Sequence, residues 1–484
     1  NANNVFISPS GVMLGECVAE PAGAMQPVCY EPIEHLQAMT GARGNGTIAS
    51  DMYALAMLAL DATGELVNRK QLTRSQLVPL ILAKGSYHFF VNEGMFSGQI
   101  IDFFRGVLLE TAKERWDTEQ LILCAGGKRY NLIPPTLPRD SNRAHHYDNA
   151  DYYSLRALSQ AYSSDSEKAM ANMREVKLLK WLDTMSYRTD TRNIMDKICA
   201  RARRLSVSSA QSHEMVARAA SAMDPQSPIR YKEISAQPDH ISLLIIQLMT
   251  HANPTMLAAF LELINADMVI FWRDLDRLHS NRLEWDVDVI RMIAKLTSIG
   301  FGSERLMYEM NPSLPCLSTA YLPYYALNAK TLMLILDSDA ASGKEPPLHD
   351  RHLMAFIAAR AQIRKEVKIA EFRDYPALYN SKTLQSLVIL ASAQEKTKTF
   401  PLHGLCAHTM LYLSEMVELF HSNDIRASLS RDLQTVLPKG NIAFLLRVLH
   451  NRDYLTNDQQ GHKLAKERFN RNQFRLTNLQ DKRM

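Results

Sequence analysis

The stretch "SDSEKAMANMREVKLLKWLDTM", residues 164–185, gives the clearest indication of how this chain folds. Its apolar side chains recur every three or four positions, the spacing that places them on one face of a helix. Ser164 is followed three positions later by Glu167, a pattern that caps the first turn of a helix. The stretch therefore predicts an amphipathic helix that buries its apolar face in a core.

The same helical periodicity runs along most of the 484 residues, which are 46% hydrophobic and 22% charged, as in an average globular protein. Strand patterns are few. A small sheet or hairpin could form from three short stretches: "SYHFFV" (86–91), "QLILC" (120–124) and "KRYNLI" (128–133). Further helices are expected over 52–62, 99–116, 190–205, 209–223, 239–251, 254–279, 286–299, 349–372, 381–396, 404–421, 424–437, 440–450 and 459–470. The fold class is therefore mainly α, a large multi-helix body with a minor β element.

Breaks in the periodicity suggest how the chain is organised. Residues 1–48 contain four prolines and one cation, Arg43, and we expect an extended N-terminal arm there. A Pro-containing stretch over 223–239 is the best candidate for a boundary between two lobes. The expected order is an arm (1–48), a helical lobe with the small β element (49–224), a second helical lobe (239–450) and a basic C-terminal segment (451–484).

The net charge of +4 is concentrated at the C-terminus. Residues 450–484 hold eight Lys or Arg and four Asp or Glu, whereas the other residues carry 47 of each sign. Cations interleaved with aromatic side chains suit the phosphates and bases of a nucleic acid. The candidate RNA-binding residues of this segment, which also contains Phe469 and Phe474, are Lys463, Lys466, Arg468, Arg471 and Arg475.

A second basic tract lies at "TRNIMDKICARARRLS", residues 191–206. Lys197, Arg201 and Arg204 stand at i, i+4 and i+7 and would share one face of a helix. They are further candidates for RNA contact. Runs of charge also form ordinary solvated faces, and that reading stays open for both tracts.

Catalytic signatures are missing from the sequence: there is neither a G-x-S-x-G elbow nor a kinase motif set. The run "LMLILDSD" (332–339) resembles the Asp-x-Asp motif of haloacid-dehalogenase-type phosphatases, which would give Asp337 and Asp339 the task of seating Mg²⁺. A Mg²⁺-dependent hydrolase therefore stays open as an alternative. The main expectation is a protein that is not an enzyme, with no catalytic residues, metal or cofactor.

Two further patterns bear on location. A helix that spans a bilayer needs about 20 mostly apolar residues. The apolar run 241–249 is too short, and the run 256–272 is interrupted by Glu262, Asn265 and Asp267. The six cysteines form no CxxC pair, which indicates reduced thiols inside a cell. We expect no membrane partner.

The whole pattern resembles the helical coat proteins of double-stranded RNA viruses of fungi and plants, such as partitiviruses and chrysoviruses. The stretches "AYLPYYALNAKTLMLILD" (320–337) and "RNQFRLTNLQDKRM" (471–484) carry this resemblance. It implies a capsid protein, found in the virion and the host cytoplasm, whose many copies assemble into an icosahedral shell around an RNA genome. Contact with that RNA would be independent of its sequence.

A second resemblance is to the nucleoproteins of negative-strand RNA viruses. Those proteins are also helical and two-lobed, and they bind single-stranded RNA between their lobes. In that case residues 223–239 would be the hinge.

Overall fold

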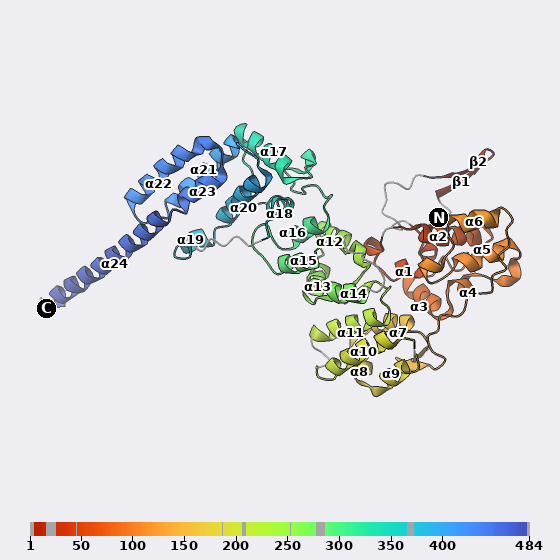
Figure 1. The fold of residues 1–484 in the computed structure, drawn as a ribbon. Helices are drawn as coiled ribbons and strands as arrows, with labels where there is room; N and C mark the ends of the chain where they lie inside the picture. The colour runs from red at the N-terminus through yellow and green to blue at the C-terminus, as the bar shows by residue number, and fades with distance from the viewer. Residues whose placement is uncertain are drawn as a thin grey trace. The chain divides into compact units, whose positions relative to one another are not determined.

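The computed structural model describes residues 4–15, 26–44, 46–185, 187–205, 210–251, 253–276, 286–364 and 372–481. The chain divides into two compact units, residues 1–287 and 288–484. Helices make up most of both units, and the strands of the described ranges pair only as two-stranded antiparallel hairpins. The predicted mainly α fold is confirmed (Figure 1).

The first unit contains three hairpins and most of the shorter helices. The strands are β1 (Val5–Ser8), β2 (Gly11–Leu14), β3 (His145–Tyr147), β4 (Ala150–Tyr152), β5 (Ile229–Tyr231) and β6 (Ile234–Ala236). The helices are α1 (Ile33–Leu36), α2 (Ile48–Ala62), α3 (Arg74–Lys84), α4 (Ser86–Phe90), α5 (Gln99–Val107), α6 (Thr118–Ala125), α7 (Leu155–Tyr162), α8 (Ser166–Arg174), α9 (Val176–Leu182), α10 (Thr189–Ala202), α11 (Ala210–Met223), α12 (Ile241–Thr250), α13 (Pro254–Asn265) and α14 (Met268–Asp276).

The second unit is helical throughout its described residues. Its helices are α15 (Val287–Ala294), which starts at the boundary, α16 (Ser303–Met310), α17 (Ala329–Ala341), α18 (Arg351–Arg360), α19 (Pro376–Tyr379), α20 (Lys382–Thr397), α21 (His403–Val417), α22 (Asn423–Val436), α23 (Ile442–Leu449) and α24 (Arg452–Asp481). Helix α17 packs against α21, α16 against α18, and α20 against α23.

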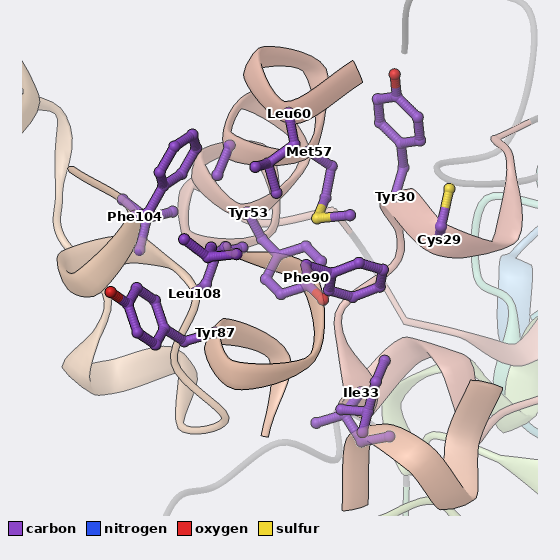
Figure 2. Packing of buried hydrophobic residues seen from close by; sticks show 14 of the residues in the cluster. Cys29, Tyr30, Ile33, Tyr53, Met57, Leu60, Tyr87, Phe90, Phe104 and Leu108 are labelled. Atoms are coloured by element: carbon purple, nitrogen blue, oxygen red, sulfur yellow. The ribbon is translucent and has the colours of Figure 1, made fainter. Parts of the chain in front are cut away.

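Part of the expected arm belongs to a core. Figure 2 shows Cys29, Tyr30 and Ile33 beside side chains of α2, α4 and α5, and all three are buried. The short helix α1 is also held by Glu34, whose carboxylate accepts two hydrogen bonds from the Arg115 guanidinium at 2.6 and 2.9 Å. Residues 28–44 therefore fold into the first unit because they bury apolar side chains, and over these residues the expected extended arm is not observed.

The stretch 164–185 forms two helices in a second core of the first unit. Met170 and Met173 of α8 and Leu178 and Leu182 of α9 are buried in it. The predicted capping box is wrong by one residue: Asp165, not Ser164, accepts hydrogen bonds from the backbone at the start of α8. The predicted continuous helix is also broken, because the backbone at Glu175 is extended.

The three predicted strands are wrong. Residues 86–90 form α4 and residues 120–124 lie in α6, because short apolar runs fit a buried helix as well as a strand. Over 128–133 the backbone is irregular. There the buried carboxylate of Asp102 accepts hydrogen bonds from three successive backbone N–H groups, those of residues 130–132, at 3.0–3.1 Å. A side chain thus satisfies donors that a neighbouring strand would otherwise have paired.

The Pro-containing stretch expected to separate two lobes lies inside the first unit. Its hairpin β5–β6 is buried and contacts α11, α13 and α14. The boundary between the compact units falls instead at residues 287 and 288.

The predicted helix 254–279 is interrupted. Helix α13 ends at Asn265 and α14 begins at Met268, because Asp267 adopts a left-handed backbone with φ of 56°. In the described ranges no single helix has the length and apolarity to cross a membrane. Residues 254–265 and 268–275 reach that limit only as a pair bent by 55°.

Close packing in the second unit predicts a strong effect at Gly404. A Cβ atom there would lie 2.3 Å from the backbone oxygen of Asp337, so α17 and α21 would have to separate. We expect Gly404→Ala to lower the free energy of unfolding by about 3 kcal/mol. Denaturant unfolding measures it. The matched control is Gly461→Ala, at an exposed helical position with open space around it, which should stabilise by up to about 1 kcal/mol. Equal stability of the two variants would contradict the packing argument.

Candidate nucleic-acid interface

Helix α24 is anchored to the second unit near its start. Asp458 is 1% exposed, and its carboxylate accepts hydrogen bonds from the Tyr375 hydroxyl at 2.8 Å and from the N–H groups of His421 and Ser422 at 3.0 and 2.7 Å. The ring of His462 contacts that of His421 in a tilted arrangement, with centroids 3.8 Å apart. These contacts hold α24 as far as His462.

The Asp458 carboxyl is stabilised in its ionised form. Burial alone raises its pKa, but the hydrogen bonds from His421, Tyr375 and Ser422 outweigh burial, and the pKa lies below its usual range. A carboxyl whose pKa falls on folding contributes stability above its unfolded pKa of about 3.9. That contribution is lost as the pH falls through the lowered folded value, so the anchor should release in acid.

Replacing the anchor should loosen the helix. We expect Asp458→Ala to cost about 3 kcal/mol, because it leaves several buried donors without an acceptor. Hydrogen exchange should show faster amide exchange in the first turns of α24. The control is Asp453→Ala, an exposed carboxylate one turn earlier, expected to cost less than about 1 kcal/mol. Unchanged exchange in Asp458→Ala would show that α24 is held by other contacts.

Beyond the anchor, α24 is exposed to solvent. Every side chain from Gly461 to Arg475 and on to Leu476 is exposed, and the helix runs out from the body of its unit (Figure 1). The five cations predicted for RNA contact all lie on this part: Lys463, Lys466, Arg468, Arg471 and Arg475. Of these, Arg471 lies 4.0 Å from the carboxylate of Glu467, an ion pair too exposed to neutralise it strongly.

The three arginines form a row. At 100° per residue, Arg468, Arg471 and Arg475 fall on one face and span about 10 Å of helix axis. Phe474 lies about 60° from Arg471 on one side of this row and Phe469 about 100° from Arg468 on the other, and they are 68% and 66% exposed. Lys463 projects about 20° from Phe474, and Lys466 lies on the far side of the helix from the row. Guanidinium groups in a row can contact successive phosphates, and exposed phenyl rings can stack on bases.

Within the described part of the chain, the second basic tract, residues 191–206, offers fewer unpaired cations for RNA contact than α24 does. Lys197 and Arg201 lie on exposed positions of α10, but Arg204 lies beyond the end of the helix, which stops at Ala202. The Arg201 guanidinium is 3.6 Å from the carboxylate of Glu214. The predicted single helical face is therefore interrupted, and one of its three cations is already paired.

Asp337 and Asp339 have partners within the second unit. The Asp337 carboxylate accepts a hydrogen bond from the N–H of Leu405 at 2.8 Å, at the start of α21. The Asp339 carboxylate pairs with the ammonium of Lys344 at 3.0 Å. Two residues apart on α17, their side chains leave the helix about 160° apart. Across the described ranges, no three His, Cys, Asp or Glu side chains gather into a metal-binding group.

An apolar surface that the sequence analysis missed lies on the hairpin β1–β2. Five of its large apolar side chains are exposed: Phe6 (55%), Ile7 (85%), Val12 (67%), Met13 (58%) and Leu14 (79%). The strand pairs join Ile7 to Val12 and Val5 to Leu14, which places these four side chains on one face. The sequence does contain a pattern that could have predicted this hairpin: two short apolar runs on either side of Pro9 and Ser10.

No family model, curated protein or solved structure matches this chain.

Proposed function

We propose that this protein is a structural viral protein that assembles with copies of itself around RNA, as a capsid protein does. The observation that carries the proposal is the exposed outer part of α24, with its arginine row and flanking phenylalanines. RNA contact of this kind is made with the phosphate backbone, so its affinity depends on the salt concentration but not on the base sequence of the RNA.

The outer part of α24 gains little stability from its own unit. Helices in proteins draw most of their stability from packing an apolar face, and residues 461–476 bury none. Its cations, at Lys463, Lys466, Arg468, Arg471 and Arg475, outnumber the one carboxylate, Glu467. A polyanion that neutralises this charge would stabilise the helix and release counterions.

The hairpin β1–β2 supports the self-assembly part of the proposal. A single two-stranded hairpin is at best marginally stable in water. Exposed apolar side chains clustered on it are typical of a surface that another protein covers. Copies of one chain that meet through such surfaces should bury more than about 1,000 Å² at each stable interface.

A nucleoprotein of a negative-strand RNA virus is the second candidate. The observation that favours it is the division of the chain into two compact helical units. Both candidates share the RNA-binding helix, and they differ in the assembly that forms.

Negative-stain imaging of the purified protein, with and without added single-stranded RNA, tests both candidates. Closed particles support the capsid protein. Rings or helices that require RNA support the nucleoprotein. Monodisperse single copies in both samples would overturn the proposal that this protein assembles.

A further inference from the structure

A cleft in the first unit lies between α3, α7 and the hairpin β3–β4. Its volume is about 710 Å³, within the range of small-molecule sites. Val78, Pro79 and Leu82 of α3 and Ala157 and Ala161 of α7 supply apolar walls. The cleft is separate from α24 in sequence and belongs to the other compact unit.

Three tyrosines line the cleft: Tyr147, Tyr152 and Tyr153. The rings of Tyr147 and Tyr152 lie 6.1 Å apart between centroids. The Tyr147 hydroxyl is buried and has no hydrogen-bond partner anywhere in the described part of the chain. Burial raises its pKa, so it stays protonated and can donate.

The lining of the cleft carries two carboxylates and two guanidinium groups in different places. Both acids, Asp148 and Asp151, belong to the hairpin β3–β4, where Asp148 pairs with Lys168 at 2.8 Å and Asp151 with His146 at 3.1 Å. The arginines lie on other segments, so a phosphate would be placed there. The two cations of the lining differ. Arg74 donates to the backbone oxygen of Ala38, and the Arg139 guanidinium lies over the Tyr153 ring, 4.5 Å from its centroid. Burial and the nearby Arg43 lower the pKa of Arg74, and the carboxylate of Glu31 acts against them.

A flat ring with an attached phosphate matches these walls. Aromatic rings and aliphatic side chains bind the two faces of a nucleobase, and an arginine that already stacks on an aromatic ring suits a phosphate oxygen. The amides of Gln37 and Gln160 also line the cleft. The Gln37 Nε2 donates to the Gln160 Oε1 at 3.0 Å, and that oxygen also accepts from Arg230 at 2.7 Å, so both amides are held in place.

We propose that this cleft binds one nucleotide, with the base between the tyrosines and the aliphatic wall and the phosphate at Arg139 and Arg74. The nucleotide could be free or part of an RNA strand. Only binding of a nucleotide that is part of RNA rests on the proposed function. Nucleotide binding in the cleft can therefore be tested separately from RNA binding by α24.

Titration of the full chain with adenosine monophosphate, followed calorimetrically, tests the binding. We expect saturable binding in the range of 10 µM to 1 mM and weaker binding of adenosine. Ala83 is exposed on α3 and lines the cleft, so Ala83→Phe should fill the space and weaken binding at least tenfold. Arg139→Ala should remove most of the preference for the phosphate. The control Ala125→Phe, at an exposed position of α6 outside the cleft, should bind as the native protein does.

Two further arms separate the sources. A short oligoadenylate that competes with the monophosphate supports RNA as the source, and one that does not compete supports a free nucleotide. The variant that removes Arg468, Arg471 and Arg475 should keep its nucleotide binding even if it loses RNA binding. The proposal is overturned if the native chain binds no monophosphate up to 10 mM, or if Ala83→Phe and Ala125→Phe bind it equally.

Discussion

Replacing Arg468, Arg471 and Arg475 together with alanine is expected to weaken RNA binding about 400-fold at 50 mM salt. Each phosphate contact on a single strand contributes about 0.7 to the slope of log affinity against log salt, so three contacts contribute about 2. If the affinities of the native and variant proteins converge near 1 M salt, a slope difference of about 2 over 1.3 decades of salt gives a factor of about 400 at 50 mM. The phenylalanines that flank the row stay in place, so stacking is retained.

Fluorescence anisotropy of a labelled 20-nucleotide homopolymer between 50 and 500 mM salt measures both the affinity and the slope. The matched control removes three exposed cations elsewhere, Lys177, Lys180 and Lys330, with the same change in net charge. It should change the affinity by less than about threefold. Equal losses in the two triple variants would mean that only net charge matters and that the row on α24 is not an RNA-binding surface.

Replacing Ile7, Val12 and Leu14 with serine is expected to weaken self-association on the order of a thousandfold. These three side chains share one face of the hairpin and are 85%, 67% and 79% exposed, so the single copy loses little by the change. Full burial of such a side chain at an interface contributes about 1.5–3 kcal/mol, and three of them contribute about 5 kcal/mol. The native protein should therefore form particles at concentrations where the variant stays a single copy.

Mass photometry and negative-stain imaging across a dilution series compare the two. The control replaces three apolar residues outside the hairpin that are also more than half exposed, Ile122, Ile133 and Val176, again with serine. That control should assemble as the native protein does. If the hairpin variant assembles at the native concentration, the exposed face of β1–β2 takes no part in the contact between copies.

Much of the helical architecture was predictable from sequence because it depends on local periodicity. The start of α13 illustrates this: the helix expected from residue 254 does begin at Pro254, and the Asn253 side chain accepts from the N–H of Met256 at 3.1 Å. The break at Asp267 was not predictable, because a left-handed residue inside an apolar run leaves no periodic signal.

The strand predictions failed for a related reason. A short run of mostly apolar residues fits the period of a helix as well as that of a strand, and the packing of neighbouring elements selects between the two structures. Asp102 shows that residues far away in sequence affect this choice, since from α5 it accepts hydrogen bonds from the irregular backbone of residues 130–132. The capping box at Ser164 failed only by one position, because Asp165 offers an equally good acceptor.

For the candidate site, charge counting alone located the basic end of the chain, since composition needs no coordinates. The exposure of each cation, the arginine row between two phenylalanines and the anchoring of α24 by Asp458 required three-dimensional information. The nucleotide-sized cleft and the exposed apolar face of the hairpin did too. Periodicity and composition are properties of neighbours along the chain, whereas burial, pairing and cavities come from residues far apart in sequence, and only packing brings those together.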